Sequence, residues 1–422
     1  MKPVHQYSRG YAMLRPYVDF CTYQSYRRVE IRGRKRIPRE GKIILMPNHC
    51  NALMDALVVL RTRKGPIAFG ARADIFAKKT AADALYFLRI LPMVRIRDGL
   101  KEVLRNYEAM DLIAETMENE VPFCMFCEGT HRTKHSLLPI KKGGIRAALH
   151  AQSRQPEGKD VYLQPIGLEY GDHFRFRSTS LLEFGDPINV SQFLRDHPDL
   201  PQGELYRALE EQLKERISAL ITYIPDDADY EGTWALTRII NAGRRGNLRR
   251  RRDRNQQVIR RILEEAPLQQ LRERAIAFDQ ARKAKGISIH SFAARRPVLR
   301  VVLKSLLFLI LFPVFVVEAL LSMPIWLTAE ILGARMKDKA FRNTARYGCK
   351  LAISPIVFLL LGIVGFLTLP WYGALILLAA FIPSLSCFYD FMEYSRVLLS
   401  DIKLRLDPQL RAEFAAIKEA AK

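Results

Sequence analysis

A histidine and an aspartate near the start of the chain have the types and spacing of a proton-transfer pair. The segment from Pro47 to Asp55 reads PNHCNALMD, so five residues separate His49 from Asp55. A carboxylate at this distance can bind one imidazole nitrogen and fix its tautomer, which leaves the other nitrogen to take a proton from an alcohol. Taken alone the pair is weak evidence, because a histidine close to an aspartate is common in proteins.

Three further segments carry residues that suit a phosphorylated ligand. Residues 126–132 read FCEGTHR, in which a carboxylate and a glycine at a strand end suit a tight turn that closes on a ligand. The basic residues that follow, Lys141 among them, can pair with phosphate, as can Arg95 at the end of an apolar stretch. The last segment is an apolar strand that contains Pro165. Taken alone, each segment is better explained by a structural role than by a functional one.

Short apolar runs alternate with stretches of helical pattern around these segments. The pattern predicts strands at 28–34, 42–46, 66–70, 90–96, 121–126 and 161–168, and helices at 51–63, 73–89, 99–119, 142–152 and 203–223. Such alternation is typical of an α/β layered domain, which we expect to cover residues 1–227. His49 follows an expected strand directly, a position where α/β proteins often place their chemistry. Residues 8–26 have the spacing of an amphipathic helix that lies on a membrane or on the domain behind it.

The charge of the chain indicates anionic partners. Its 422 residues are 49% hydrophobic and 26% charged, with a net charge of +22. Nucleic acid, anionic lipid and phosphorylated substrates all fit such a charge. Residues 228–297 form a basic segment of helical pattern, which is either a solvated surface or a strip that binds anionic membrane lipid. We expect no nucleic-acid partner, because no recognised motif and no regular aromatic interleaving accompany the basic run.

The chain from residue 298 to 405 has the composition of a membrane region. Residues 351–369 and 371–389 are apolar runs near the roughly 20 residues that span a bilayer. Basic residues flank these runs but are absent from the turn between them, so the sequence predicts a hairpin at 351–389 that crosses out and back. The preceding run, 301–332, would start and end on the cytoplasmic side. We expect it to be a re-entrant pair of half-helices broken near Pro313, or a pair of interfacial helices.

The cysteines and the N-terminus carry no further signal. Only Cys124 and Cys127 are close together, and no second pair lies at a metal-like spacing, so we expect two small buried residues and no metal site. The first 20 residues lack a long apolar core and a cleavage site. We therefore expect no secretory signal peptide and a catalytic part in the cytoplasm.

Taken in order, the four segments resemble the glycerophospholipid acyltransferase family. Its blocks read Asn-His-x4-Asp, an apolar stretch ending in Arg, Phe-Pro-Glu-Gly-Thr, and an apolar strand with Pro, and the resemblance covers roughly residues 25–225. The chain is most similar to the glycerol-3-phosphate/dihydroxyacetone-phosphate acyltransferase branch, which shares the five-residue spacing in the first block. It also shares the later segments FRS at 176–178 and EFGDPI at 183–188, and a C-terminal membrane hairpin. Cys127 departs from the pattern, because it stands where the family has a proline.

The resemblance implies a fold and a reaction. The fold is an α/β acyltransferase domain, a mixed sheet flanked by helices, followed by a basic helical segment and C-terminal transmembrane helices. In the reaction His49, oriented by Asp55, deprotonates an acceptor hydroxyl, which attacks the thioester of acyl-CoA or acyl carrier protein without a covalent acyl-enzyme, cofactor or metal. The implied substrate-binding residues are Asn48, Arg95, Glu128, Gly129, Thr130, Lys141 and Pro165, with Arg95 on the acceptor phosphate.

The residues leave the acceptor open. The branch favours glycerol 3-phosphate or dihydroxyacetone phosphate, on the route to phosphatidic acid. The alternative acceptor is 1-acylglycerol 3-phosphate. A function of a different class is a non-catalytic basic scaffold on the membrane. The four ordered segments argue against it.

Overall fold

The computed structural model describes residues 3–93, 100–156, 158–244, 246–293 and 296–422, with the backbone alone for 100–107. Contacts divide the chain into two compact units, which are described separately. The first unit draws on Met1–Tyr23, Arg28–His173 and Thr179–Ile221, and the second on Gln24–Arg27, Phe174–Ser178 and Thr222–Lys422. The three domain limits expected from the sequence remain a proposal.

A mixed sheet forms the centre of the first unit. The path β1-β7-β6-β2-β5-β3-β4 orders its strands, and β8 pairs with β6. The consecutive strands β6, β2, β5, β3 and β4 run parallel, whereas β7 and β8 pair antiparallel with β6. The strands are β1 (Tyr26–Arg32), β2 (Lys42–Pro47), β3 (Ala68–Arg72), β4 (Ile90–Met93), β5 (Phe123–Cys124), β6 (Val161–Tyr170), β7 (Ser178–Phe184) and β8 (Ile188–Asn189).

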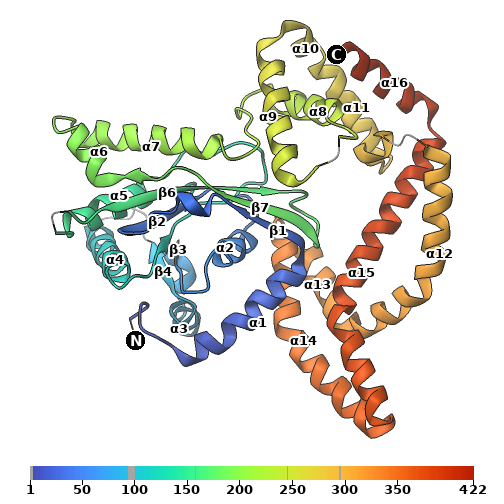
Figure 1. The fold of residues 1–422 in the computed structure, drawn as a ribbon, viewed down its shortest axis with the longest axis horizontal. Helices are drawn as coiled ribbons and strands as arrows, with labels where there is room; N and C mark the ends of the chain where they lie inside the picture. Colours follow the sequence, from blue (N-terminus) through green and yellow to red (C-terminus); the bar gives the residue numbers. More distant parts are fainter. Residues whose placement is uncertain (1–2, 94–99, 157, 245, 294–295) are drawn as a thin grey trace. The chain divides into compact units, whose positions relative to one another are not determined.

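Helices flank this sheet, as α6 and α7 on one side and α2 and α3 on the other show (Figure 1). Close approaches of backbone bring them onto the strands, since a side chain at Gly167 of β6 would meet Leu220 just after α7. The expected mixed sheet with flanking helices is confirmed. The helices are α1 (Arg9–Ser25), α2 (Leu53–Leu60), α3 (Lys79–Phe87), α4 (Leu100–Glu118), α5 (Lys142–Ser153), α6 (Val190–Asp196) and α7 (Gln202–Ser218).

Several expected elements are shorter than the sequence pattern predicts. The helix expected at 73–89 is a 3-10 turn, Ala73–Phe76, followed by α3. The helix expected at 51–63 begins only at Leu53, because the backbone of Ala52 has a φ of 46°, outside the helical range. The strand expected at 121–126 keeps two residues, Phe123–Cys124, and the end of the strand expected at 90–96 lies outside the described residues.

The second unit contains a small helical bundle. It is built from α8 (Tyr230–Ile240), α9 (Leu248–Glu264), α10 (Ala266–Gln270), α11 (Arg272–Ala284), a 3-10 turn (Ile289–Ala293) and α16 (Pro408–Ala420). Its apolar side chains share one core that includes Leu236, Phe278 and Phe414. The basic residues of α9 therefore lie on a helix whose apolar side is buried.

Among the described residues of the second unit, three helices are long and apolar enough to cross a membrane. They are α12 (Pro297–Leu321), α14 (Phe341–Thr368) and α15 (Trp371–Arg405), and α13 (Met323–Arg335) lies between the first two. A side chain at Gly365 of α14 would touch Ala374 of α15, so the two helices of the expected hairpin pack closely. That the hairpin crosses a bilayer stays a prediction.

The break expected near Pro313 is wrong. Helix α12 continues through Pro313 to Leu321. The helical conformation is interrupted at Ser322, and α13 begins at the next residue. A proline removes one backbone hydrogen bond inside a helix but none in its first turn, where Pro324 of α13 lies. Pro324, not Pro313, therefore marks the boundary between the helices.

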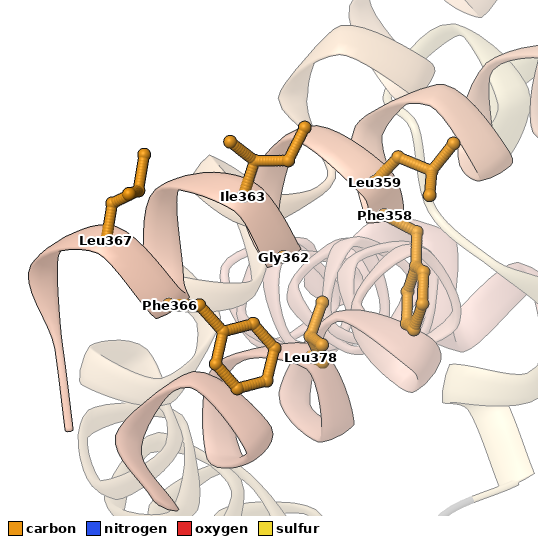
Figure 2. A pocket seen from close by; sticks show the side chains of 7 residues that line it. All are labelled: Phe358, Leu359, Gly362, Ile363, Phe366, Leu367 and Leu378. Atoms are coloured by element: carbon orange, nitrogen blue, oxygen red, sulfur yellow. The ribbon is translucent and has the colours of Figure 1, made fainter. Parts of the chain in front are cut away.

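A shallow apolar hollow lies between α14 and α15 (Figure 2). Gly362 opens it, because a side chain there would reach only Leu378. The hollow carries no titratable or nucleophilic group, so we assign it to the apolar surface of the hairpin and not to a chemical site. Its lining residues are Phe358, Leu359, Gly362, Ile363, Phe366, Leu367 and Leu378.

Candidate active site

The candidate site lies where three neighbouring parallel strands end. Strand β2 pairs in parallel with β5 on one side and β6 on the other. His49 comes two residues after β2, Glu128 four residues after β5, and Tyr170 is the last residue of β6. Because parallel strands end at the same edge of a sheet, residues far apart in the sequence meet there.

His49 and Asp55 form the pair that their spacing predicts. The Nδ1 atom of His49 lies 2.8 Å from Oδ2 of Asp55, whose side chain is fully buried. The same oxygen accepts hydrogen bonds from the backbone N–H groups of Cys50 at 2.8 Å and Asn51 at 2.7 Å. Asp55 lies in the first turn of α2, where the helix dipole favours a negative group. Backbone hydrogen bonds therefore fix the position of the carboxylate independently of its contact with the imidazole.

Tyr170 completes the surroundings of the carboxylate. Its hydroxyl donates a hydrogen bond of 2.7 Å to Oδ1 of Asp55, the oxygen that His49 does not use. Tyr170 is not among the site residues predicted from the sequence. A tyrosine expected near a buried strand end signals that its hydroxyl needs a partner, but the sequence does not say which of the distant acids supplies it.

The imidazole ring of His49 is held between two aromatic neighbours. It stacks on Phe126, with ring centres 4.1 Å apart, and His131 meets it edge-on at 5.5 Å. The side chain keeps 17% of its surface exposed. Among the described residues no hydrogen-bond partner is found for Nε2, so this atom is available to a substrate hydroxyl.

Glu128 connects the loops around His49 by hydrogen bonds. Its Oε1 accepts the N–H of His49 at 2.7 Å, and its Oε2 accepts the N–H of Leu138 at 2.8 Å. Burial raises the pKa of the Glu128 carboxyl, and these two amide hydrogen bonds oppose the rise. The next residue, Gly129, has a φ of 65°, a backbone conformation that glycine adopts without strain. Both oxygens of Glu128 thus bind backbone, which makes the residue a support for His49.

Asn48 joins two strands. Its Oδ1 accepts the N–H of Leu168 at 2.6 Å, and its Nδ2 donates to the carbonyl of the same residue at 3.1 Å. The side chain is buried. Asn48 therefore ties the end of β2 to β6 immediately before His49.

The other expected binding residues lie near the His49–Asp55 pair or outside the described residues. Thr130 and Lys141 are exposed, and a side chain at Gly129 would come within 3.1 Å of Cγ of Lys141. Pro165 lies within β6 opposite Met46, and its carbonyl accepts the N–H of Gly185 at 2.9 Å. Arg95 lies outside the described residues. The substrate-binding roles of these residues remain predictions.

The cysteines near the site are inert. Cys50, Cys124 and Cys127 are buried, and burial raises the pKa of each thiol well above its usual range. A thiol that stays protonated is a poor nucleophile. The expectation that Cys124 and Cys127 are small buried residues is confirmed. In the described parts of the chain, no three histidine, cysteine, aspartate or glutamate side chains gather into a metal-binding group.

Part of this chain is similar to known acyltransferases. Residues 28–169 match the family model described as Acyltransferase. Glycerol-3-phosphate O-acyltransferase 2 of Saccharomyces cerevisiae is 30% identical over 135 residues, which cover 31% of this chain and 17% of that protein. Glycerol-3-phosphate O-acyltransferase 1 of the same yeast is 36% identical over 70 residues, or 17% and 9% of the two chains. This chain thus matches less than a fifth of the length of either yeast relative.

Solved structures also resemble part of this chain. The 1-acyl-sn-glycerophosphate acyltransferase PlsC of Thermotoga maritima aligns with 49% of this chain and 79% of its own. The TM-score is 0.35 and the sequence identity is 21%.

Proposed function

We propose that this chain, whose residues 28–169 belong to an acyltransferase-family domain, moves a fatty acyl group from a thioester to a hydroxyl of a glycerol phosphate. The observation that carries the proposal is the His49–Asp55 pair, with its carboxylate held by two backbone amides and a tyrosine hydroxyl. An imidazole fixed at Nδ1 is suited to accept a proton at Nε2.

The proposed reaction has one nucleophilic step at the thioester carbonyl. Nε2 of His49 takes the proton of the acceptor hydroxyl as its oxygen attacks the carbonyl carbon. The tetrahedral oxyanion then collapses, which breaks the carbon–sulfur bond and forms the ester. The thiolate that leaves takes the proton from His49, so the histidine returns neutral and no acyl-enzyme forms. The Asp55 carboxylate stabilises the imidazolium between the two proton transfers.

The acceptor proposed is glycerol 3-phosphate or dihydroxyacetone phosphate. Both yeast relatives are named glycerol-3-phosphate O-acyltransferases, which supports a small phosphorylated acceptor. Arg95 is proposed to bind its phosphate, since a guanidinium matches phosphate with two hydrogen bonds. The net charge of +22 would also attract acyl-CoA or acyl carrier protein, because both donors are acidic. We propose no resident cofactor or metal.

The membrane is part of the proposal. Helices α12, α14 and α15 are long and apolar enough to hold the enzyme in a bilayer, where its acyl chains and products partition. We place the catalytic unit on the cytoplasmic side, because basic residues flank the apolar runs and such residues stay cytoplasmic.

An acceptor panel tests the proposal. Detergent-solubilised enzyme would be supplied with radiolabelled acyl-CoA or acyl carrier protein and one of three acceptors: glycerol 3-phosphate, dihydroxyacetone phosphate or 1-acylglycerol 3-phosphate. We expect transfer to one of the first two to exceed transfer to the third. Preference for the third acceptor would overturn the substrate assignment. Absence of transfer to all three, with folded protein, would favour a non-catalytic membrane scaffold.

A further inference from the structure

The exposed face of α1 is more apolar than its buried face. A helix on the surface of a soluble domain usually buries its apolar side and exposes its polar side. The buried residues of α1 are mainly polar, namely Arg15, Cys21, Thr22 and Ser25. The exposed residues are Arg9, Gly10, Met13, Pro16, Phe20 and Tyr23. The usual arrangement is therefore reversed in this helix.

Three exposed apolar side chains lie on one side of α1. Met13, Phe20 and Tyr23 follow each other at seven and then three residues, a spacing that places them on the same helix face. Met13 is 80% exposed, Tyr23 63% and Phe20 44%. The apolar surface continues onto α3, because Tyr11 meets the exposed ring of Phe87 edge-on at 6.5 Å. Figure 1 shows the start of α1 beside α3. We call Met13, Phe20, Tyr23 and Phe87 the apolar strip.

Polar contacts on the inner side of α1 fix which face points outward. Arg15 donates hydrogen bonds to three carbonyls at and after the end of α2. Arg61 donates to the carbonyl of Asp19 at 3.2 Å, and the Asp19 carboxylate, the one acid of α1, is paired with Arg15. A rotation of α1 that hid the apolar strip would break these bonds, at a cost in free energy. The strip therefore stays exposed unless another surface covers it.

A basic loop runs beside the apolar strip. The guanidinium carbon of Arg61 lies 5.6 Å from the ring centre of Tyr23, and the next basic residues, Arg63 and Lys64, are exposed. Exposed aromatic and aliphatic side chains beside basic residues are typical of a helix that lies in the interface of a membrane. An anionic bilayer offers acyl chains to the strip and phosphates to the loop, so it matches both features at once.

We propose that the apolar strip of α1 lies in the surface layer of an anionic bilayer, with Arg63 and Lys64 at the lipid phosphates. The helix then lies parallel to the membrane plane, with its apolar face about 5–10 Å into the boundary between headgroups and acyl chains. The first unit thus has a bilayer contact of its own. The inference needs no step of acyl transfer, so it holds or fails independently of the proposed reaction.

A fluorescent label on α1 tests this contact in the full chain. Met13→Cys, in a chain whose exposed Cys387 is replaced by serine, would carry an environment-sensitive dye. The labelled protein would be reconstituted into vesicles of phosphatidylcholine and phosphatidylglycerol. A quencher attached to the upper part of the lipid acyl chains should remove most of the fluorescence, and a water-soluble quencher should remove little. The reverse result would overturn the proposal.

A label elsewhere on the same unit is the matched control. Glu211 is exposed on α7, which lies on the other side of the sheet (Figure 1). A dye at Glu211→Cys should respond to the water-soluble quencher and not to the lipid quencher. Equal lipid quenching at Met13 and Glu211 would overturn the proposal. Adding His49→Ala to the Met13 probe should leave its quenching unchanged, which separates this contact from acyl transfer. Adding Phe20→Glu should reduce it, because a charge then lies within the strip.

The basic loop is tested through the lipid composition. Arg63→Ala/Lys64→Ala should reduce lipid quenching of the Met13 label in vesicles with phosphatidylglycerol, and should have little effect in phosphatidylcholine alone. The control Arg207→Ala/Lys214→Ala removes two exposed cations of α7 and should change neither. Equal effects of the two double variants would contradict the role of the loop. A Met13 label shielded from both quenchers would show a second copy of the chain on this face, and would also overturn the proposal.

Discussion

At the scale of single residues, the position of Asp55 depends on groups that do not touch a substrate. Two backbone amides and the Tyr170 hydroxyl donate hydrogen bonds to the carboxylate, which in turn binds the imidazole of His49. Catalysis by such a pair should therefore be sensitive to Tyr170, although this hydroxyl is remote from the reacting atoms.

Replacing Tyr170 by phenylalanine tests that dependence. Tyr170→Phe keeps the ring and removes the hydroxyl that donates to Asp55. We expect kcat to fall about tenfold, equivalent to roughly 1.4 kcal/mol, with KM unchanged. The matched control is Tyr162→Phe on the same strand, whose hydroxyl binds Asp160 instead. Steady-state rates that fall equally for both variants, or a change confined to KM, would contradict a positioning role.

Glu128 gives a prediction for stability as a function of pH. Burial raises the pKa of its carboxyl, so the folded protein binds this proton more tightly than the unfolded chain. The stabilisation is complete below the unfolded pKa of about 4.3 and is lost as pH rises through the folded value. The variant Glu128→Gln cannot titrate. It should melt below the wild type, since one amide N–H loses its acceptor at a cost of about 1–3 kcal/mol.

The quantity to measure is the difference in melting temperature between the wild type and Glu128→Gln. It should shrink as the pH is raised from about 4 to about 7, because only the wild type loses stability from this group. Melting in detergent would measure it. A gap that widens with pH would show that ionised Glu128, held by the N–H groups of His49 and Leu138, is the stabilised form.

At the scale of elements, the docking of α1 depends on one buried arginine. The guanidinium of Arg15 donates to the carbonyls of Leu60 at 2.6 Å, Arg63 at 2.9 Å and Gly65 at 3.3 Å. These carbonyls lie at and just after the C-terminus of α2, the helix that carries Asp55. The amphipathic helix expected at 8–26 is thus present, and Arg15 attaches it to the domain behind it.

Removing Arg15 should loosen α1 from α2. We expect Arg15→Ala to lower the free energy of unfolding by about 2–3 kcal/mol, because carbonyls within the packed structure lose a charged donor. Arg9→Ala, in the exposed first turn of α1, should change it by less than about 0.5 kcal/mol. Chemical denaturation of the two variants measures both. Equal stabilities would show that α1 is held by other contacts.

The order of strands and helices could be predicted from the sequence because each has its own hydrophobic period. The pair His49 and Asp55 could be predicted because both belong to one short segment. Tyr170 could not, since the parallel pairing of β2 with β6 brings it to Asp55 from 115 positions away. The break after α12 was misplaced because two prolines of one apolar run look alike, whereas only Pro324 lies where a helix tolerates the missing N–H.

At the scale of the whole molecule, the charge pattern predicts on which side of the membrane each loop lies. Five of the six cysteines are buried, whereas Cys387 of α15 is exposed, so a cysteine placed in a loop can be labelled selectively once Cys387 has been replaced by serine. In sealed vesicles, a membrane-impermeant maleimide should label Tyr372→Cys at the hairpin turn and Lys339→Cys before α14 from opposite sides. Labelling of both positions from one side would show that the α14–α15 hairpin does not cross the bilayer.

The central claim is that His49 removes the proton of the acceptor hydroxyl. Its most direct test is the rate of radiolabelled acyl transfer to glycerol 3-phosphate by purified His49→Ala, compared with wild type of equal melting temperature. Loss of the base should lower kcat by about a hundredfold to ten-thousandfold, the usual contribution of a positioned general base. Full transfer by folded His49→Ala would contradict the mechanism.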